Sequence, residues 1–333
     1  MDDADTPEPN QSFEDQWAAL HDFADRNRRH RYGPMADRLR TAGPPPRLHN
    51  TPIILDTDIG GDPADAIALT CAARNLPELA LVITSDEIRG RRARFARHLL
   101  DLHGRTDVPV VSGADLGNTR YWAARRLTPA GIPTQSTDIH AAVHAVCTRT
   151  QTPVRWVGMG PLSNLSSVLE TAPELGERLA ITQMGGILDN PSPHRTEHNF
   201  RLDPAAAAHV LATAHRLLLV PANITSTPAI AIDSDTGLYR HLAAPDAPAW
   251  ARLLHAHLDQ WFATLHPASM QHDPLALATA LQLPFTDFTR TPLTATADAQ
   301  LRVDTGGRPV FHVTKADHQP FWRWLTAQLV YDT

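Results

Sequence analysis

The sequence predicts an α/β protein: an open, mostly parallel sheet with helices on both faces, preceded by an N-terminal helical extension. Three observations predict this class. From Pro52 onward, short β-branched runs alternate with helix-like runs, which is typical of a parallel sheet covered by helices. The chain has 333 residues, 42% of them hydrophobic, enough for one large α/β domain. No internal repeat is visible. We therefore expect one main domain at 49–333, after an extension and linker at 1–48.

The extension begins with an acidic head and continues with Phe13, Trp17, Leu20 and Phe23 at near-helical spacing. A Gly-Pro-Pro-Pro run at 43–46 then breaks the pattern. This predicts one or two amphipathic helices followed by a linker. The helical part would either pack on the main domain or contact a partner or a second subunit, and the sequence leaves both open.

The main domain follows the alternation of strand and helix in order. The predicted strands cover 53–58, 79–84, 109–112, 154–158, 179–184 and 217–220, and the predicted helices cover 64–74, 91–103, 139–148, 162–170 and 204–215. Residues 243–282 have a helical pattern. A hairpin is predicted between 300–304 and 309–313, and a last helix carries Trp322 and Trp324.

Composition excludes several classes of function. The formal net charge is −6 and the basic side chains are scattered, which argues against a nucleic acid polymer as partner. No run approaches the roughly 18 apolar residues of a membrane helix, and the acidic start lacks the features of a signal peptide, so we expect a cytoplasmic protein. Cys71 and Cys147 lie in alanine-rich helical segments and are predicted to be buried small hydrophobes.

Four carboxylates surround the end of the first predicted strand and the glycine turn after it: Asp56, Asp58, Asp62 and Asp65. In an open parallel sheet the ligand lies at the carboxyl ends of the strands. Repulsion would raise the pKa of some of these groups, and a hard divalent ion with oxygen ligands holds them ionised together. Asp62 taken alone is equally explained as the cap of the next helix. The cluster predicts a metal site.

Three later segments also follow strand ends or begin helices. Glycines on both sides of Met159 would let its carbonyl approach a ligand, although a simple turn explains them as well. Asparagine and glutamate in the loop at 189–203 offer donors and acceptors to a polyhydroxylated ligand. In His272-Asp273-Pro274, the aspartate is either a ligand or a helix cap.

These four segments, in this order, resemble the inosine-uridine nucleoside hydrolase family over roughly residues 50–330. The run from Asp56 to Asp65 is similar to a longer variant of the family signature D-x-D-x-G-x-D-D, and the G-P-L-[ST]-N, E-x-N-x-x-x-D-P and H-D-P elements have counterparts. The resemblance implies a nucleoside hydrolase-like fold, a bound Ca²⁺ ion, hydrolysis of the N-glycosidic bond of a nucleoside-like substrate, and a homo-oligomer.

The resemblance also implies roles for individual residues. Asp58 would accept the proton of the attacking water, and His272 would protonate the leaving base. The implied metal ligands are Asp58, Asp65, Asp273 and the Met159 carbonyl, with Asp56 supporting them, and the implied sugar ligands are Asn190, Glu197 and Asn199.

The sequence departs from the family pattern on the sugar side. Ala64 stands where the family has a carboxylate that binds the ribose hydroxyls, and Asp62 is a candidate substitute. Residues 84–87 differ from a segment that touches the sugar, and Arg201 replaces a commonly apolar residue, either pairing with a nearby aspartate or recognising a phosphate or carboxylate. We therefore expect an unusual substrate, such as a modified, deoxygenated or phosphorylated nucleoside.

Two other readings of the sequence remain. A phosphatase of the haloacid dehalogenase type also begins with a strand ending in D-x-D, but it needs a lysine, and Lys315 is the only one. A non-catalytic binding or interaction protein on the same fold would account for Ala64. His255 and His257 are expected at the surface or beside the leaving group.

Overall fold

The computed structural model describes residues 22–28, 48–188 and 196–331. The chain divides into two compact units, Met1–Arg47 and Leu48–Thr333. In the first unit, residues 22–26 are helical, and the rest of the predicted amphipathic segment lies outside the described residues. Among the described residues, no helix is long and apolar enough to cross a bilayer. The second unit carries the sheet and the candidate site.

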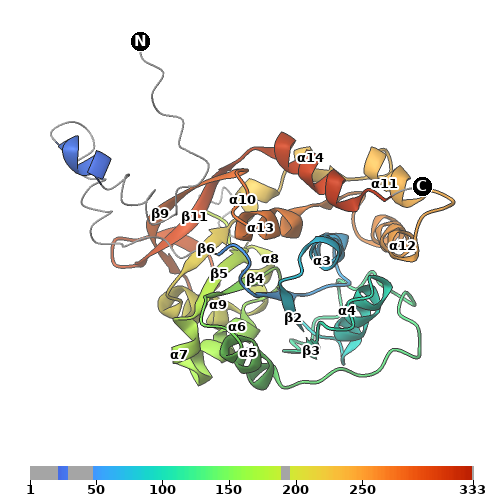
Figure 1. Cartoon of the computed structure of the whole chain (residues 1–333), viewed down its shortest axis with the longest axis horizontal. Helices are drawn as coiled ribbons and strands as arrows, with labels where there is room; N and C mark the ends of the chain where they lie inside the picture. The colour runs from blue at the N-terminus through green and yellow to red at the C-terminus, as the bar shows by residue number, and fades with distance from the viewer. Residues whose placement is uncertain (1–21, 29–47, 189–195, 332–333) are drawn as a thin grey trace, which may run out of the picture. The chain divides into compact units, whose positions relative to one another are not determined.

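The second unit is built on one nine-stranded sheet (Figure 1). Its strands are β1 (Ile53–Thr57), β2 (Leu79–Thr84), β3 (Val110–Ser112), β4 (Val154–Gly158), β5 (Leu179–Met184), β6 (Leu217–Val220), β9 (Thr286–Ala295), β10 (Leu301–Val303) and β11 (Arg308–Ala316). The order is β10-β9-β11-β6-β5-β4-β1-β2-β3, and all neighbours from β11 to β3 pair in parallel. The chain therefore winds outward in both directions from β1 and β4, which makes the β1/β4 boundary the topological switch point.

Alternate side chains of the buried strands point to opposite faces of the sheet and pack into two hydrophobic layers. Ile53 and Leu55 of β1 pack with α3 (Pro63–Asn75), α4 (Arg91–Leu102), α12 (Ala249–Thr264), α13 (His272–Ala280) and α14 (His318–Leu329). Ile54 faces the other way and packs with α5 (Ile139–Thr148), α6 (Ser163–Thr171) and α9 (Pro204–Thr213). Helices thus cover both faces of the sheet, as predicted. Cys71 and Cys147 are free and buried.

The remaining helices are short or peripheral. They are α7 (Pro173–Gly176), α8 (His198–Leu202), α10 (Ala222–Thr225), α11 (Gly237–Leu242) and the 3₁₀ turn η2 (Pro228–Ile230). A separate two-stranded sheet joins β7 (Ala231–Ile232) to β8 (Ser269–Met270). Because β8 follows α12 and precedes α13, the segment predicted as helical over 243–282 is two helices with a strand between them.

The predicted hairpin near the C-terminus is wrong. β10 and β11 do not pair with each other, because β9 lies between them and pairs antiparallel with both. β9 was not predicted: it is rich in threonine, carries Pro292 and is half-exposed over much of its length, so it lacks the apolar alternation typical of a strand. The glycines at 306 and 307 form the turn before β11.

Candidate active site

The candidate site is a pocket of about 750 Å³ at the carboxyl ends of the central strands. Its lining includes four of the predicted carboxylates, both predicted sugar ligands that the structure describes, and His272. The full lining is Asp58, Gly61, Asp62, Asp65, Tyr121, Met159, Met184, Ile187, Thr196, Glu197, His198, Asn199, Arg201, Ala222, Ser226, Trp261, His272 and Asp273. Asn190 lies outside the described residues. The switch point of a doubly wound sheet is where such proteins bind small ligands.

The ends of β1 and β4 place the first half of the site. The Met159 amide donates to the Asp56 carbonyl at 2.7 Å, which extends the β1–β4 pairing past the last residue of β4. Gly160 follows, and a Cβ there would lie 2.2 Å from the Ser85 hydroxyl and 3.0 Å from the Asp58 nitrogen. Only glycine fits this approach, so the glycine beside Met159 allows the turn to lie against Asp58.

Asp56 is buried and is not among the residues that line the pocket. It is 1% exposed, and its carboxyl accepts a hydrogen bond from the Asn164 amide at 2.8 Å. The same amide group donates to the Thr84 carbonyl at 3.1 Å, and its oxygen accepts from the Ala114 amide at 2.9 Å. Burial raises the pKa of Asp56 to about 8 despite the bond from Asn164. Asp56 therefore supports the strand end and does not line the pocket.

Three buried carboxylates, Asp58, Asp65 and Asp273, line the pocket from three elements: the end of β1, the first turn of α3 and the first turn of α13. Burial raises the pKa of Asp65, and the nearby Asp58 charge raises it further. Burial also raises the pKa of Asp273, and the charges of Asp65 and Asp58 raise it further. Gln271 is the N-cap of α13, so Asp273 is not the helix cap that the alternative reading proposed.

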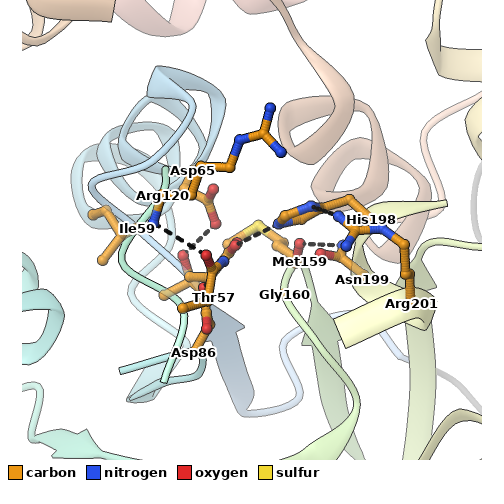
Figure 2. A network of polar contacts seen from close by, with 12 residues as sticks. Thr57, Ile59, Asp65, Asp86, Arg120, Met159, Gly160, His198, Asn199 and Arg201 are labelled. Atoms are coloured by element: carbon orange, nitrogen blue, oxygen red, sulfur yellow. Dashed lines mark hydrogen bonds and ion pairs between the residues drawn. The ribbon is translucent and has the colours of Figure 1, made fainter. Parts of the chain in front are cut away.

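The side chains of these three aspartates are not arranged as a metal-binding cluster among the described residues. Within the described ranges, no group of three or more His, Cys, Asp or Glu side chains has metal-binding geometry. Asp65 instead accepts a hydrogen bond of 2.5 Å from the Thr57 hydroxyl (Figure 2). The donor chemistry nevertheless fits a hard cation, because the candidate ligands are all oxygens, and burial together with the neighbouring carboxylates raises the pKa of Asp65 and Asp273.

Asp62 is used as the helix cap that the sequence allowed. Its Oδ1 accepts from the Ala64 amide at 3.1 Å and also from the Ser269 hydroxyl, while its side chain still lines the pocket. Burial raises the pKa of Asp62 to about 7, against the effect of the Ser269 bond. Ala64 itself is fully buried and does not line the pocket.

Glu197 and Asn199 also hold the protein's own backbone. The Glu197 carboxylate caps α8 by accepting from the amides of Asn199 at 3.0 Å, Phe200 at 3.1 Å and Gly186 at 2.9 Å. The Asn199 side-chain amide donates to the Met159 carbonyl at 2.7 Å, and both residues line the pocket (Figure 2). A carboxylate has about four acceptor positions, so Glu197 keeps one for a substrate hydroxyl.

His272 begins α13 and lies half-buried at the pocket. Its Nδ1 is 2.6 Å from the Thr225 hydroxyl. Burial lowers the pKa of His272 to about 4, so the imidazole is neutral at pH 7.

The sequence reasoning missed His198 and Tyr121. His198 Nδ1 accepts from the Arg201 guanidinium at 3.1 Å (Figure 2). Its Nε2 is 3.9 Å from Asp58 Oδ2, and Tyr121 packs edge-on against the imidazole with ring centroids 5.1 Å apart. The position of His198 inside the motif from Glu197 to Asn199 was a usable signal, because adjacent residues of a pocket loop share the pocket. Tyr121, in a long irregular segment, gave no signal.

The segment at 84–87 does not reach the pocket. Asp86 pairs with Arg92 at 3.0 Å, both side chains being fully buried, and Glu87 accepts from the amide of Arg92 at 3.3 Å and from the Thr84 hydroxyl at 2.6 Å. Arg92 also donates to the backbone carbonyls of Asp58 and Ile59. The departure from the family pattern at this segment therefore builds a buried ionic network beneath the site. These residues are not among those that line the pocket.

His257 is also placed differently from the expectation. It is fully buried on α12, packs edge-on against Phe95 and donates through Nε2 to the Gly61 carbonyl at 3.1 Å. Burial lowers its pKa to about 4. His257 is thus a core histidine that supports the glycine turn, and not a surface or leaving-group residue.

The fold and the position of the pocket define a doubly wound α/β protein with an acidic small-molecule site at its switch point. The sequence model of the inosine-uridine preferring nucleoside hydrolase family matches residues 53–327. The chain belongs to this family, whose members are hydrolases that act on N-glycosyl bonds of ribonucleosides. The match runs against the phosphatase alternative.

Individual relatives agree. The chain is 31% identical over 290 residues to the pyrimidine-specific ribonucleoside hydrolase RihA of Enterobacter sp. (strain 638), covering 80% of this chain and 88% of that protein. RihA of Escherichia coli (strain SMS-3-5 / SECEC) is 28% identical over the same shares. Among solved structures, an inosine-guanosine nucleoside hydrolase superposes with a TM-score of 0.71 at 20% identity, over 85% of this chain and all of that one. A plant nucleoside hydrolase superposes with a TM-score of 0.69 at 21% sequence identity, with the same coverage of both chains. These structures share the fold.

Proposed function

We propose that the protein hydrolyses the N-glycosidic bond of a nucleoside-like substrate in a calcium-dependent reaction, with Asp58 as the general base. The observation that carries this proposal is the convergence of Asp58, Asp65, Asp273 and the Met159 carbonyl on one pocket at the switch point. Oxygen ligands of this kind suit Ca²⁺, which accepts six to eight of them. When bound, the ion would acidify a water molecule and offset the repulsion among the carboxylates.

In this proposal, different residues of the chain carry out the separate steps of the reaction. Asp58 takes the proton of the water that attacks the anomeric carbon, and the bond from that carbon to the base nitrogen breaks. His272 protonates the departing base as an imidazolium, after taking up a proton in the substrate complex. Glu197, Asn199 and Asn190 orient the sugar hydroxyls, and Asp62, which lines the same pocket, replaces the carboxylate absent at Ala64.

The test is base release from a panel of purine, pyrimidine, deoxy and phosphorylated nucleosides, with calcium and then with excess chelator. We expect release that the chelator abolishes and calcium restores. Asp58→Asn should lower kcat by about 10²–10⁴-fold, the usual contribution of a positioned base. Asp246→Asn, at an exposed aspartate outside the pocket, is the matched control and should retain activity. Turnover that survives in Asp58→Asn, or is indifferent to chelator, contradicts the assignment.

The His272 role has its own test. His272→Ala should slow release of a natural base much more than release of p-nitrophenolate from p-nitrophenyl riboside, because that leaving group departs without a proton. Equal losses on both substrates would show that His272 does not protonate the leaving group. No turnover of any panel member by a protein that binds calcium would favour the non-catalytic binding protein.

A further inference from the structure

Arg201 supplies the one full positive charge on a pocket wall that is otherwise acidic or neutral. Of the described residues that line the pocket, it is the only arginine or lysine. The sequence left open whether it pairs with an aspartate or recognises an anionic substrate. Within the described part of the chain, no carboxylate lies within ion-pair distance of its guanidinium, which donates to His198 Nδ1 at 3.1 Å.

The contacts of His198 fix where that charge lies. The imidazole of His198 lies between two charged groups: its Nε2 is 3.9 Å from Asp58 Oδ2, and its Nδ1 accepts a hydrogen bond from Arg201 (Figure 2). The imidazole ring therefore separates the guanidinium from Asp58, the predicted general base. Tyr121 packs against the same ring, and Arg120 stacks over Tyr121 at 5.2 Å. A second guanidinium therefore lies on the same aromatic wall. His198 and Arg201 lie on α8, beside Glu197 and Asn199 and so on the sugar side of the proposed site, whereas Arg120 and Tyr121 come from the segment between β3 and α5.

We propose that this wall binds a phosphate ester on the sugar, and that the preferred substrate is a nucleoside monophosphate. The proposal rests on the proposed function and specifies its substrate class. Arginine presents several donors in a planar fork that matches phosphate oxygens, and one contact with His198 leaves most of them available. The reaction remains hydrolysis: water adds to the anomeric carbon, the base leaves with a proton, and the second product is the sugar phosphate.

The first test compares kcat/KM for uridine and inosine with that for their 5′- and 3′-monophosphates, using the full chain with calcium. We expect at least a tenfold preference for one monophosphate, and Arg201→Gln should reduce that preference by about 10- to 100-fold, the range for loss of charge-assisted contacts. Arg201→Lys should recover part of the preference. Arg323→Gln, at an exposed arginine of α14 outside the pocket, should keep it.

A second test separates this proposal from the proposed function. Calorimetry measures binding of ribose 5-phosphate and of ribose to the wild-type protein and to Arg201→Gln, with no need for turnover. Tighter binding of the sugar phosphate, lost in Arg201→Gln, supports the phosphate subsite even if no substrate is cleaved. Cleavage of nucleosides without any preference for a monophosphate, or equal binding of the two sugars, overturns the subsite and leaves the hydrolase intact.

Discussion

Replacing Arg92 by methionine should cost far more stability than a typical surface change, because Arg92 holds the strand end on which the site is built. Its Nε donates to the Asp86 carbonyl at 2.6 Å, and one terminal nitrogen forms the 3.0 Å ion pair with the Asp86 carboxylate. The other terminal nitrogen donates to the carbonyls of Asp58 and Ile59. Both side chains of the pair are fully buried.

The magnitude follows from what the substitution leaves behind. Removing one partner of a buried ion pair costs about 3–5 kcal/mol, because the other charge stays buried without compensation. Burial already raises the pKa of Asp86 to about 6, and this effect exceeds the opposing effect of Arg92. The desolvation cost of the pair is therefore not fully recovered by its attraction. For that reason the double variant Arg92→Met/Asp86→Asn should be less destabilised than Arg92→Met alone.

Urea unfolding at pH 7 measures these differences, with chelator present so that calcium binding does not mask them. Arg91→Met, at the exposed neighbouring position of α4, is the matched control and should stay within about 0.5 kcal/mol of wild type. A loss below about 1 kcal/mol in Arg92→Met would refute the reasoning. So would a double variant whose loss equals the sum of the two single losses, since coupled partners are not additive.

Three further predictions concern buried groups around the site. Asn164→Ala should lower the free energy of unfolding by about 2–4 kcal/mol in a denaturant titration, because it leaves Asp56 and the Ala114 amide unpaired; no measurable loss would contradict this. His257 has a folded pKa of about 4, below its unfolded value of 6.5, so the unfolded state binds more protons between these values and stability falls as pH falls. At pH 5 wild type should have lost about 2 kcal/mol more than His257→Gln relative to pH 7, and parallel pH profiles would refute this assignment. Ala64→Asp should lower the melting temperature, because it buries a carboxylate, and should improve cleavage of unphosphorylated ribonucleosides in calcium if position 64 selects the sugar; reduced cleavage by folded protein would argue against that role.

The sequence was sufficient for the parts of the site that local patterns determine. A buried parallel strand is a short β-branched run, and the residue after it must lie at the sheet's carboxyl edge, so Asp58 and Met159 could be placed from sequence alone. The same pattern failed for β9, because a half-exposed strand with threonines and a proline does not show it. Pairing partners near the C-terminus depended on that strand, so the predicted hairpin failed with it.

Tertiary contacts explain most of the remaining differences. Arg92 begins an ordinary amphipathic helix in sequence, and only the packing of α4 beneath β1 brings its guanidinium to the Asp58 carbonyl. His257 is likewise one of two histidines on α12, and only its contacts with Gly61 and Phe95 distinguish it. Whether a polar side chain can be buried depends on hydrogen-bond partners that lie far away in the chain, and sequence periodicity carries no information about those partners.

The two halves of the pocket differ in how much a substitution in them would cost in stability, and this difference affects which residues can set the substrate preference. The carboxylate half is tied to strand ends, helix first turns and a buried network, so a substitution there disturbs the fold as well as the site. The half formed by α8 projects His198 and Arg201 from a five-residue helix that Glu197 caps with its carboxylate. Glu197 thus preserves the backbone of this wall whatever its neighbours are. Substitutions at positions 198 and 201 should therefore change the substrate preference at little cost in stability; His198 lies 3.9 Å from Asp58, and Arg201 contacts the far side of the His198 ring.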